Sequence, residues 1–211
     1  MSDEITYARI EERWAPELEA IELSVFKTID PSDLYHREEL VKLARTFPEG
    51  NFVALDGERP IGMGLGILVD FDFEQPDHSL SDIAGDDGVS THRPNNDWYY
   101  GTDISVYPEY RGRGIGRKLY ELRKDCVRDL NKKGIVAGGV LPGYADHIDD
   151  MTAQAYIDKV KAGELYDSTL SFQIENGFDA RTAIPNYLED PTVGNWSVLI
   201  VWENPDYSPA G

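Results

Sequence analysis

The sequence predicts a mixed α/β (α+β) fold in which helices flank one sheet. Stretches with strand and helix periodicity follow one another along the chain, and no Ser/Gly/Pro-rich linker divides it. Near the middle, a strand leads through a glycine-rich turn into an amphipathic helix. The 211 residues, 41% of them hydrophobic, suffice for one core. We therefore expect residues 1–211 to form a single domain.

The N-terminal part has the pattern of one strand followed by two helices. Residues 5–9 predict the first strand. Three apolar residues then recur at the spacing of one helix face: Leu18, Ile21 and Val25. Asp30 and Pro31 provide an N-cap and a first-turn proline for the second helix. The residues expected on its buried face are Leu40, Leu43, Ala44 and Phe47.

A β-hairpin is expected next, with strands at residues 52–55 and 60–69 joined by a turn at Asp56 and Gly57. In its second strand, four apolar residues share one face and three glycines share the other. The apolar face holds Met63, Leu65, Ile67 and Val69, and the glycine face holds Gly62, Gly64 and Gly66. Because no basic residue or helix follows these glycines, we expect them to serve close packing.

Residues 70–97 predict a long acidic loop. The segment carries eight acidic residues and one basic residue, Arg93, without a sustained period. Loops of this length in compact domains are functional or are solvated insertions. A functional loop of this charge would steer a cationic amine toward the protein, and the sequence leaves both interpretations open.

The central motif joins a strand at residues 98–106 to a glycine-rich turn at 111–116 and then to a helix. The apolar face expected for that helix consists of Ile115, Leu119, Leu122, Cys126 and Leu130. Gly134 is expected to stop the helix before a strand at 135–140. Glycines let backbone N–H groups approach a pyrophosphate, and a helix N-terminus favours negative charge.

Helices near 152–162 and 167–176 and strands near 178–184 and 196–203 complete the chain.

The charge distribution supports an anion site at this turn. The whole chain has a formal charge of −19, which disfavours nucleic acid and anionic membranes as partners. Residues 111–133 nevertheless hold nine basic and three acidic residues. A solvated helix carrying intrahelical ion pairs is the competing interpretation.

Other sequence features indicate an unexported, reduced protein. The longest apolar run, residues 61–69, is far shorter than a membrane span, and the start of the chain lacks a signal-peptide pattern. A single cysteine, Cys126, can form no internal disulfide. We therefore expect a cytoplasmic protein. No metal is expected, because the histidines have no ligand spacing.

Residues 106–116, Val-Tyr-Pro-Glu-Tyr-Arg-Gly-Arg-Gly-Ile-Gly, resemble motif A of the GNAT superfamily, whose core is Arg/Gln-x-x-Gly-x-Gly/Ala. Residues 176–178, which follow a helix, resemble that superfamily's motif B. More loosely, residues 143–147, 151–152 and 170–173 resemble a GNAT subgroup that is sometimes fused to carbon–nitrogen hydrolase domains. The resemblance implies a GNAT-like mixed, mostly antiparallel, splayed sheet flanked by helices.

The resemblance also implies acetyl-CoA or another acyl-CoA as co-substrate. The pantetheine arm would lie along the strand near Ile104 and Val106. The pyrophosphate would lie on the residues of the turn, which are Arg111, Gly112, Arg113, Gly114, Ile115, Gly116 and Arg117. A Rossmann turn fits less well, because its sixth position would be Arg117.

The usual catalytic residues of the superfamily are missing. The resemblance places the general base at Tyr100 or Thr102, and neither is a good base at neutral pH. By strand alternation, Asp103 is expected on the opposite face, and Asp97 precedes the strand, so each could act only through water or a bend. The tyrosine that often protonates the leaving thiolate is replaced by Gln173.

An insertion at residues 141–170 supplies substitute candidates, Tyr144 and His147, so the catalytic candidates are these two residues and Tyr100. The expected activity is transfer of an acetyl group from acetyl-CoA to a primary amine by direct attack. The acceptor would be a small-molecule amine or an amino-terminal group. A non-catalytic acyl-CoA-binding or sensing module of the same fold is the alternative. The superfamily often dimerises, so a homodimer is a further expectation.

Overall fold

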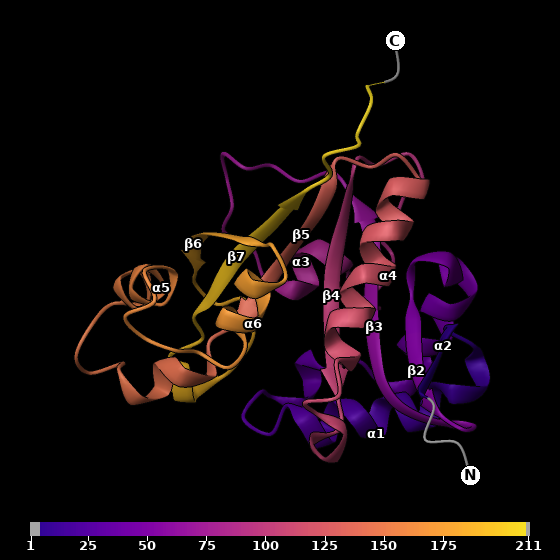
Figure 1. Ribbon diagram of the computed structural model, residues 1–211, viewed down its shortest axis with the longest axis horizontal. Coiled ribbons are helices and arrows are strands. Elements are labelled where there is room, and N and C mark those ends of the chain that lie inside the picture. Colours follow the sequence, from indigo (N-terminus) through magenta and orange to yellow (C-terminus); the bar gives the residue numbers. More distant parts are fainter. Residues whose placement is uncertain (1–4, 210–211) are drawn as a thin grey trace.

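Figure 1 shows the computed structural model, which describes residues 5–209 and contains a seven-stranded sheet in the order β1-β2-β3-β4-β5-β7-β6. The strands are β1 (Ile5–Arg9), β2 (Phe52–Asp56), β3 (Arg59–Val69), β4 (Trp98–Val106), β5 (Gly134–Val140), β6 (Asp179–Ile184) and β7 (Ser197–Glu203). Neighbouring strands are antiparallel except β4 and β5, which are parallel. The expected mixed, mostly antiparallel sheet is confirmed.

Helices cover both faces of this sheet. They are α1 (Ala15–Val25), α2 (Arg37–Thr46), α3 (Leu80–Ala84), α4 (Ile115–Asp129), α5 (Ala153–Lys161) and α6 (Leu170–Glu175). Side chains of α4, α5 and α6 share one buried cluster with one sheet face, and those of α1, α2 and α3 share a second cluster with the other face. Within residues 5–209, no helix is both long and apolar enough to cross a membrane.

Local signals placed two helix ends incorrectly. Asp30 caps only the short 3-10 turn Pro31–Asp33, and α2 begins after His36, where a capping box forms. The second misplaced end is the C-terminus of α4, which ends before Asn131, a residue with a left-handed φ of 50°. Gly134 is therefore the first residue of β5 and does not stop the helix.

Strands β4 and β5 are splayed. They pair only where residues 98–100 lie beside residues 134–136, and beyond this shared end they separate, as Figure 1 shows. Residues 101–106 of β4 still pair with β3 on their other side, except at one position. One edge of β4 is therefore open over this stretch.

Strand β4 contains a β-bulge at that position. Asp103 lies opposite Leu65, whereas Gly101 lies opposite the next residue of β3, Gly66. Thr102 is therefore the extra residue on the bulged strand. A single extra residue reverses the alternation of side chains beyond it.

Because of the bulge, Asp103 lies on the sheet face opposite to the one that strict strand alternation predicts. Directly opposed residues of an antiparallel pair share a face. Asp103 opposes Leu65 and Tyr100 opposes Ile67, and both apolar partners belong to the cluster beneath α1 and α2. Asp103 therefore lies on the same face as Tyr100, and the expectation of opposite faces was wrong.

The glycine face of β3 packs closely, as expected, and it accommodates a buried arginine of α4. A Cβ atom at Gly64 would lie 3.0 Å from Nε of Arg123, and one at Gly101 would lie 3.1 Å from its Nη1. Nη2 of Arg123 donates a hydrogen bond to the carbonyl of Leu65 at 2.6 Å. These contacts hold the guanidinium against the sheet beside the splayed strands.

Asn51 stabilises β3 next to the bulge. Its side chain is fully buried, donates to the carbonyl groups of Phe47 (2.7 Å) and Gly66 (3.0 Å), and accepts from Gly66 N–H (2.8 Å). Because Asn51→Ala leaves these groups buried without partners, we expect the free energy of unfolding to fall by about 2–4 kcal/mol in urea denaturation. In the control Asn96→Ala, only a 3.4 Å bond to Leu68 is lost. Equal losses in the two variants would contradict this role.

Candidate functional site

The glycine-rich turn before α4 faces open space. Gly112 and Gly114 have left-handed φ values of 75° and 80°, and a Cβ atom on either would meet nothing within 4 Å. Gly114 is the N-cap of α4, and the first intrahelical bond runs from Lys118 N–H to the Gly114 carbonyl at 3.0 Å. The N–H groups of residues 115–117 therefore remain available to a ligand. Their partial positive charge suits an anion.

Three exposed arginines surround this turn. Nε of Arg111 donates to the carbonyl of Val106 at 3.3 Å, and the guanidinium of Arg113 lies over the ring of Tyr110 at 5.0 Å. Arg117 lies in the first turn of α4 and is exposed. The turn thus combines backbone donors with three guanidinium groups, which are suited to phosphate oxygens.

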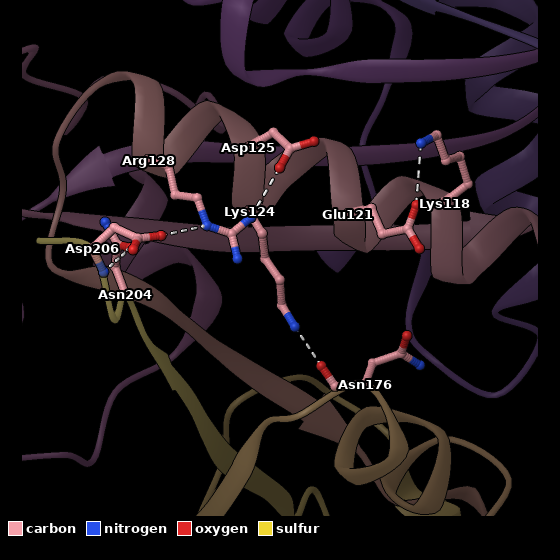
Figure 2. Close-up of polar contacts among 8 residues, drawn as sticks. All are labelled: Lys118, Glu121, Lys124, Asp125, Arg128, Asn176, Asn204 and Asp206. Atoms are coloured by element: carbon pink, nitrogen blue, oxygen red, sulfur yellow. Dashed lines mark hydrogen bonds and ion pairs between the residues drawn. The ribbon is translucent and has the colours of Figure 1, made fainter.

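Basic residues further along α4 are bonded within the protein. Figure 2 shows the Lys118–Glu121 ion pair (3.1 Å), Lys124 reaching the Asn176 carbonyl (2.5 Å), and Arg128 reaching Asp125 (2.9 Å) and Asp206 (3.2 Å). After the helix, Lys132 bonds to the Pro94 carbonyl and Lys133 pairs with Asp97. The two interpretations of the basic window thus apply to different parts of it. The C-terminal part forms internal pairs, and the N-terminal part surrounds the turn.

The splayed strands open onto a cleft with a volume of about 70 Å³. Strand β4 contributes Gly101, Thr102, Asp103 and Ile104 to its lining, and β5 contributes Ala137, Gly138 and Val140. Glu22 of α1 lines it from one side of the sheet, and Arg123 of α4 lines it from the other. Because the lining comes from both sides, the cleft passes through the sheet between β4 and β5.

Buried polar atoms without partners are concentrated at this cleft. Among residues 5–209, three buried side-chain atoms lack a hydrogen-bond partner: Arg123 Nε, Gln173 Oε1 and Tyr187 Oη. All three residues line the cleft. Because buried polar groups in folded proteins are nearly always hydrogen-bonded, these groups are available to water or to a polar ligand in the cleft.

Two buried carboxyl groups line the same cleft. Burial raises the pKa of Asp103 to about 7, against the opposing effect of Arg123 and a 2.9 Å hydrogen bond from the Ser105 hydroxyl. Burial, followed by the charge of Asp103, raises the pKa of Glu22 well above its usual value. A carboxylate in a cleft that titrates near neutral pH is suited to accept a proton from a substrate.

Tyr100 lies under the sheet and does not line the cleft. Its side chain is fully buried, and its hydroxyl lies 2.6 Å from Nε2 of His78, in the acidic segment 70–97. Thr102, the other position implied by the resemblance, does line the cleft, where its hydroxyl accepts a 2.9 Å hydrogen bond from Tyr35. Tyr100 thus connects the sheet to the acidic segment 70–97.

The structure does not bring Tyr144 and His147 to the cleft. Tyr144 is 3% exposed, and its hydroxyl donates to the Met151 carbonyl at 2.9 Å. The ring of His147 packs on Tyr156, with ring centroids 5.5 Å apart. Neither residue is part of the cleft lining, because both pack against Tyr156 of α5, within the same insertion. Gln173, in contrast, does lie in the cleft.

Glu22 and Arg123, two residues of the cleft that helical spacing places on buried helix faces, were not selected from the sequence. Glu22 follows Leu18 by four residues, and Arg123 follows Leu119 by four, so each lies on the buried face of its helix. A charged residue at such a position needs a partner or a ligand. That pattern was a signal for the site.

Comparison with known proteins identifies the class of protein that this fold and turn define. The model of the "Acetyltransferase (GNAT) family" matches residues 12–140, and the chain therefore belongs to the GNAT acetyltransferase family. Among solved structures, the loading GNATL domain of CurA from Lyngbya majuscula has a TM-score of 0.81 at 18% identity, covering 95% of this chain and 98% of that one. The GphF GNAT-like decarboxylase in complex with isobutyryl-CoA has a TM-score of 0.75 at 19% identity, covering 95% and 99%.

Two Bacillus subtilis (strain 168) proteins are relatives in sequence. "Probable hydrolase YhcX" is 37% identical over 201 residues, which cover 95% of this chain and 39% of the relative. "Uncharacterized N-acetyltransferase YkwB" is 32% identical over 177 residues, which cover 84% of this chain and 78% of the relative. The chain thus spans well under half the length of the first relative.

Proposed function

We propose that the protein transfers an acyl group, acetyl in the first instance, from an acyl-CoA to a primary amine by direct attack. The observation that carries the proposal is the glycine turn at the N-terminus of α4, which follows β4, the strand whose residues 101–104 line the cleft. The chain's membership of the GNAT acetyltransferase family supports the reaction class.

The turn and the open strand edge suit different parts of an acyl-CoA. Backbone N–H groups at residues 112–117 and the three surrounding arginines suit the pyrophosphate. The unpaired edge of β4 around Ile104 and Val106 suits the amides of the pantetheine arm, because an extended chain can add to a strand edge. Bound in this way, the co-substrate supplies an activated thioester to the cleft.

We assign the general base to Asp103. An acceptor ammonium must lose a proton before its nitrogen can form the new C–N bond, and the Asp103 carboxylate faces the cleft where it can accept that proton. The second amine proton leaves with the thiolate as the C–S bond breaks, so the products are an amide and CoA. Asp103 replaces Tyr100, Tyr144 and His147 in this role because those three do not line the cleft.

Titration of purified protein with acetyl-CoA, combined with an assay for released thiol, tests this function. We expect micromolar, saturable binding and a release of CoA that depends on added amine. Binding without amine-dependent release would favour the non-catalytic acyl-CoA-binding alternative. Absence of saturable binding would reject both.

A further inference from the structure

We propose that the acceptor is a dication, a diamine or polyamine, whose reacting nitrogen lies at Glu22 and Asp103 and whose second ammonium lies in an adjoining acidic pocket. The assignment of the reacting nitrogen rests on the proposed function. The adjoining pocket is lined by α3, the turn that follows it and residues 32–39 around the start of α2, and it contains Asp33, Glu39 and Asp86. We call it the second pocket.

The inner part of the cleft offers two carboxyl groups to a cation. Glu22 and Asp103 are 2% and 8% exposed, and the one basic side chain that lines the cleft is Arg123. Burial favours the neutral form of both carboxyl groups in the empty cleft, and Arg123 can balance one of them when it ionises. A bound ammonium would favour the ionised form of the second carboxyl group, because an opposite charge at close range stabilises a carboxylate. The hydroxyl of Tyr187, which is buried and has no partner, gives the same region a hydrogen-bonding group for a ligand.

The second pocket continues from the cleft. It has a volume of about 60 Å³ and shares four lining residues with the cleft, which are Asp33, Leu34, Tyr35 and Leu80. Two of these shared residues are leucines, so the junction between the two spaces is partly apolar. Carboxyl groups in both spaces, with two leucines beside Asp33 at the junction, match a chain of methylene groups that carries an ammonium at each end.

The charge of the second pocket selects against other acceptors. It contains three acidic residues, and none of its lining residues is basic. Asp33 is half-buried and accepts a 2.6 Å hydrogen bond from Glu189 N–H, so its position is fixed, whereas Asp86 is exposed at the rim. A monoamine would gain no charge interaction with these carboxylates, whereas the second ammonium of a dication would. An anionic acceptor would be repelled, because the whole chain carries a charge of −19.

Matched amines test the proposal. Putrescine and n-butylamine have the same carbon chain and differ in the second ammonium. We expect kcat/KM for putrescine to exceed that for n-butylamine by about tenfold at low ionic strength, and the ratio to fall as salt screens the outer charge. Asp33→Asn and Asp86→Asn should each reduce the ratio by about threefold. Asp77→Asn is the matched control, because Asp77 is an exposed residue of the same acidic segment that lines neither space.

Calorimetric titration of putrescine into protein saturated with CoA separates this proposal from the proposed function. Transfer to both amines with equal kcat/KM would overturn the dication assignment and leave the acyltransferase intact. Putrescine binding that depends on Asp86, without acyl transfer, would support the second pocket and reject the acyltransferase. A putrescine preference that is the same in Asp33→Asn, Asp86→Asn and Asp77→Asn would overturn the second pocket as its cause.

Discussion

Replacement of Asp103 by asparagine is expected to lower kcat by about 10²–10⁴-fold while leaving the affinity for acetyl-CoA within about twofold, because it removes a general base and leaves the turn before α4 unchanged. In the unmodified protein, kcat/KM should rise with pH through an apparent pKa of about 7, since burial raises the pKa of Asp103 to that value. This rise should disappear in Asp103→Asn. Pre-steady-state and steady-state rates across a pH series measure both effects.

The same substitution should stabilise the fold at alkaline pH. A carboxyl whose pKa is raised by folding contributes stability when it is protonated, and that contribution is lost as pH rises from its unfolded value to the folded value of about 7. Asparagine does not ionise, so the variant does not lose stability as the pH rises through this range. The melting temperature of Asp103→Asn relative to the unmodified protein should therefore rise between pH of about 4 and 7 and level off above it.

Asp97→Asn is the matched control for both measurements. Asp97 lies just before the same strand, but its carboxylate forms a 2.6 Å ion pair with Lys133 at a half-exposed position away from the cleft. We expect its activity and its pH profile to match those of the unmodified protein. A wild-type kcat in Asp103→Asn would remove Asp103 from the mechanism, whatever its effect on stability.

The sequence was sufficient for the fold because its strands and helices carry strong local patterns. Alternation in β3 placed Met63 and Leu65 on one face and Gly64 on the other, and the register with β4 agrees. The turn before α4 was visible in its glycines. What the pattern could not give was the bulge at Thr102, because a bulge is a property of two paired strands and not of one.

The catalytic candidates differ from the lining of the cleft for the same reason. Strict alternation placed Asp103 on the opposite face, where it could act only through water or a bend, and the insertion at residues 141–170 was therefore the preferred source of catalytic side chains. In the structure, Tyr144 is used to pack that insertion, and its hydroxyl is bonded to Met151. Glu22 comes to the cleft from a helix about 80 residues before Asp103, a proximity that only the tertiary fold creates.

The glycine turn provides the second large expected effect. Gly114→Trp is expected to weaken CoA binding by more than about 100-fold, because the indole would occupy the open space beside the helix N-terminus and displace the pyrophosphate from several charge-assisted hydrogen bonds. Binding of S-acetylpantetheine, which lacks the pyrophosphate, should change little, since it uses the edge of β4. Calorimetric titration of both ligands measures the difference.

Gly163→Trp is the matched control for this prediction. Gly163 has a left-handed φ of 73° and, like Gly114, nothing within 4 Å of an added Cβ atom, but it follows α5, away from the turn. Both substitutions carry the same strain of about 1–2 kcal/mol, because an L side chain disfavours that backbone conformation. An equal loss of CoA binding in the two variants would therefore trace the effect to instability. Loss in Gly114→Trp alone, with S-acetylpantetheine still bound, would locate the pyrophosphate at this turn.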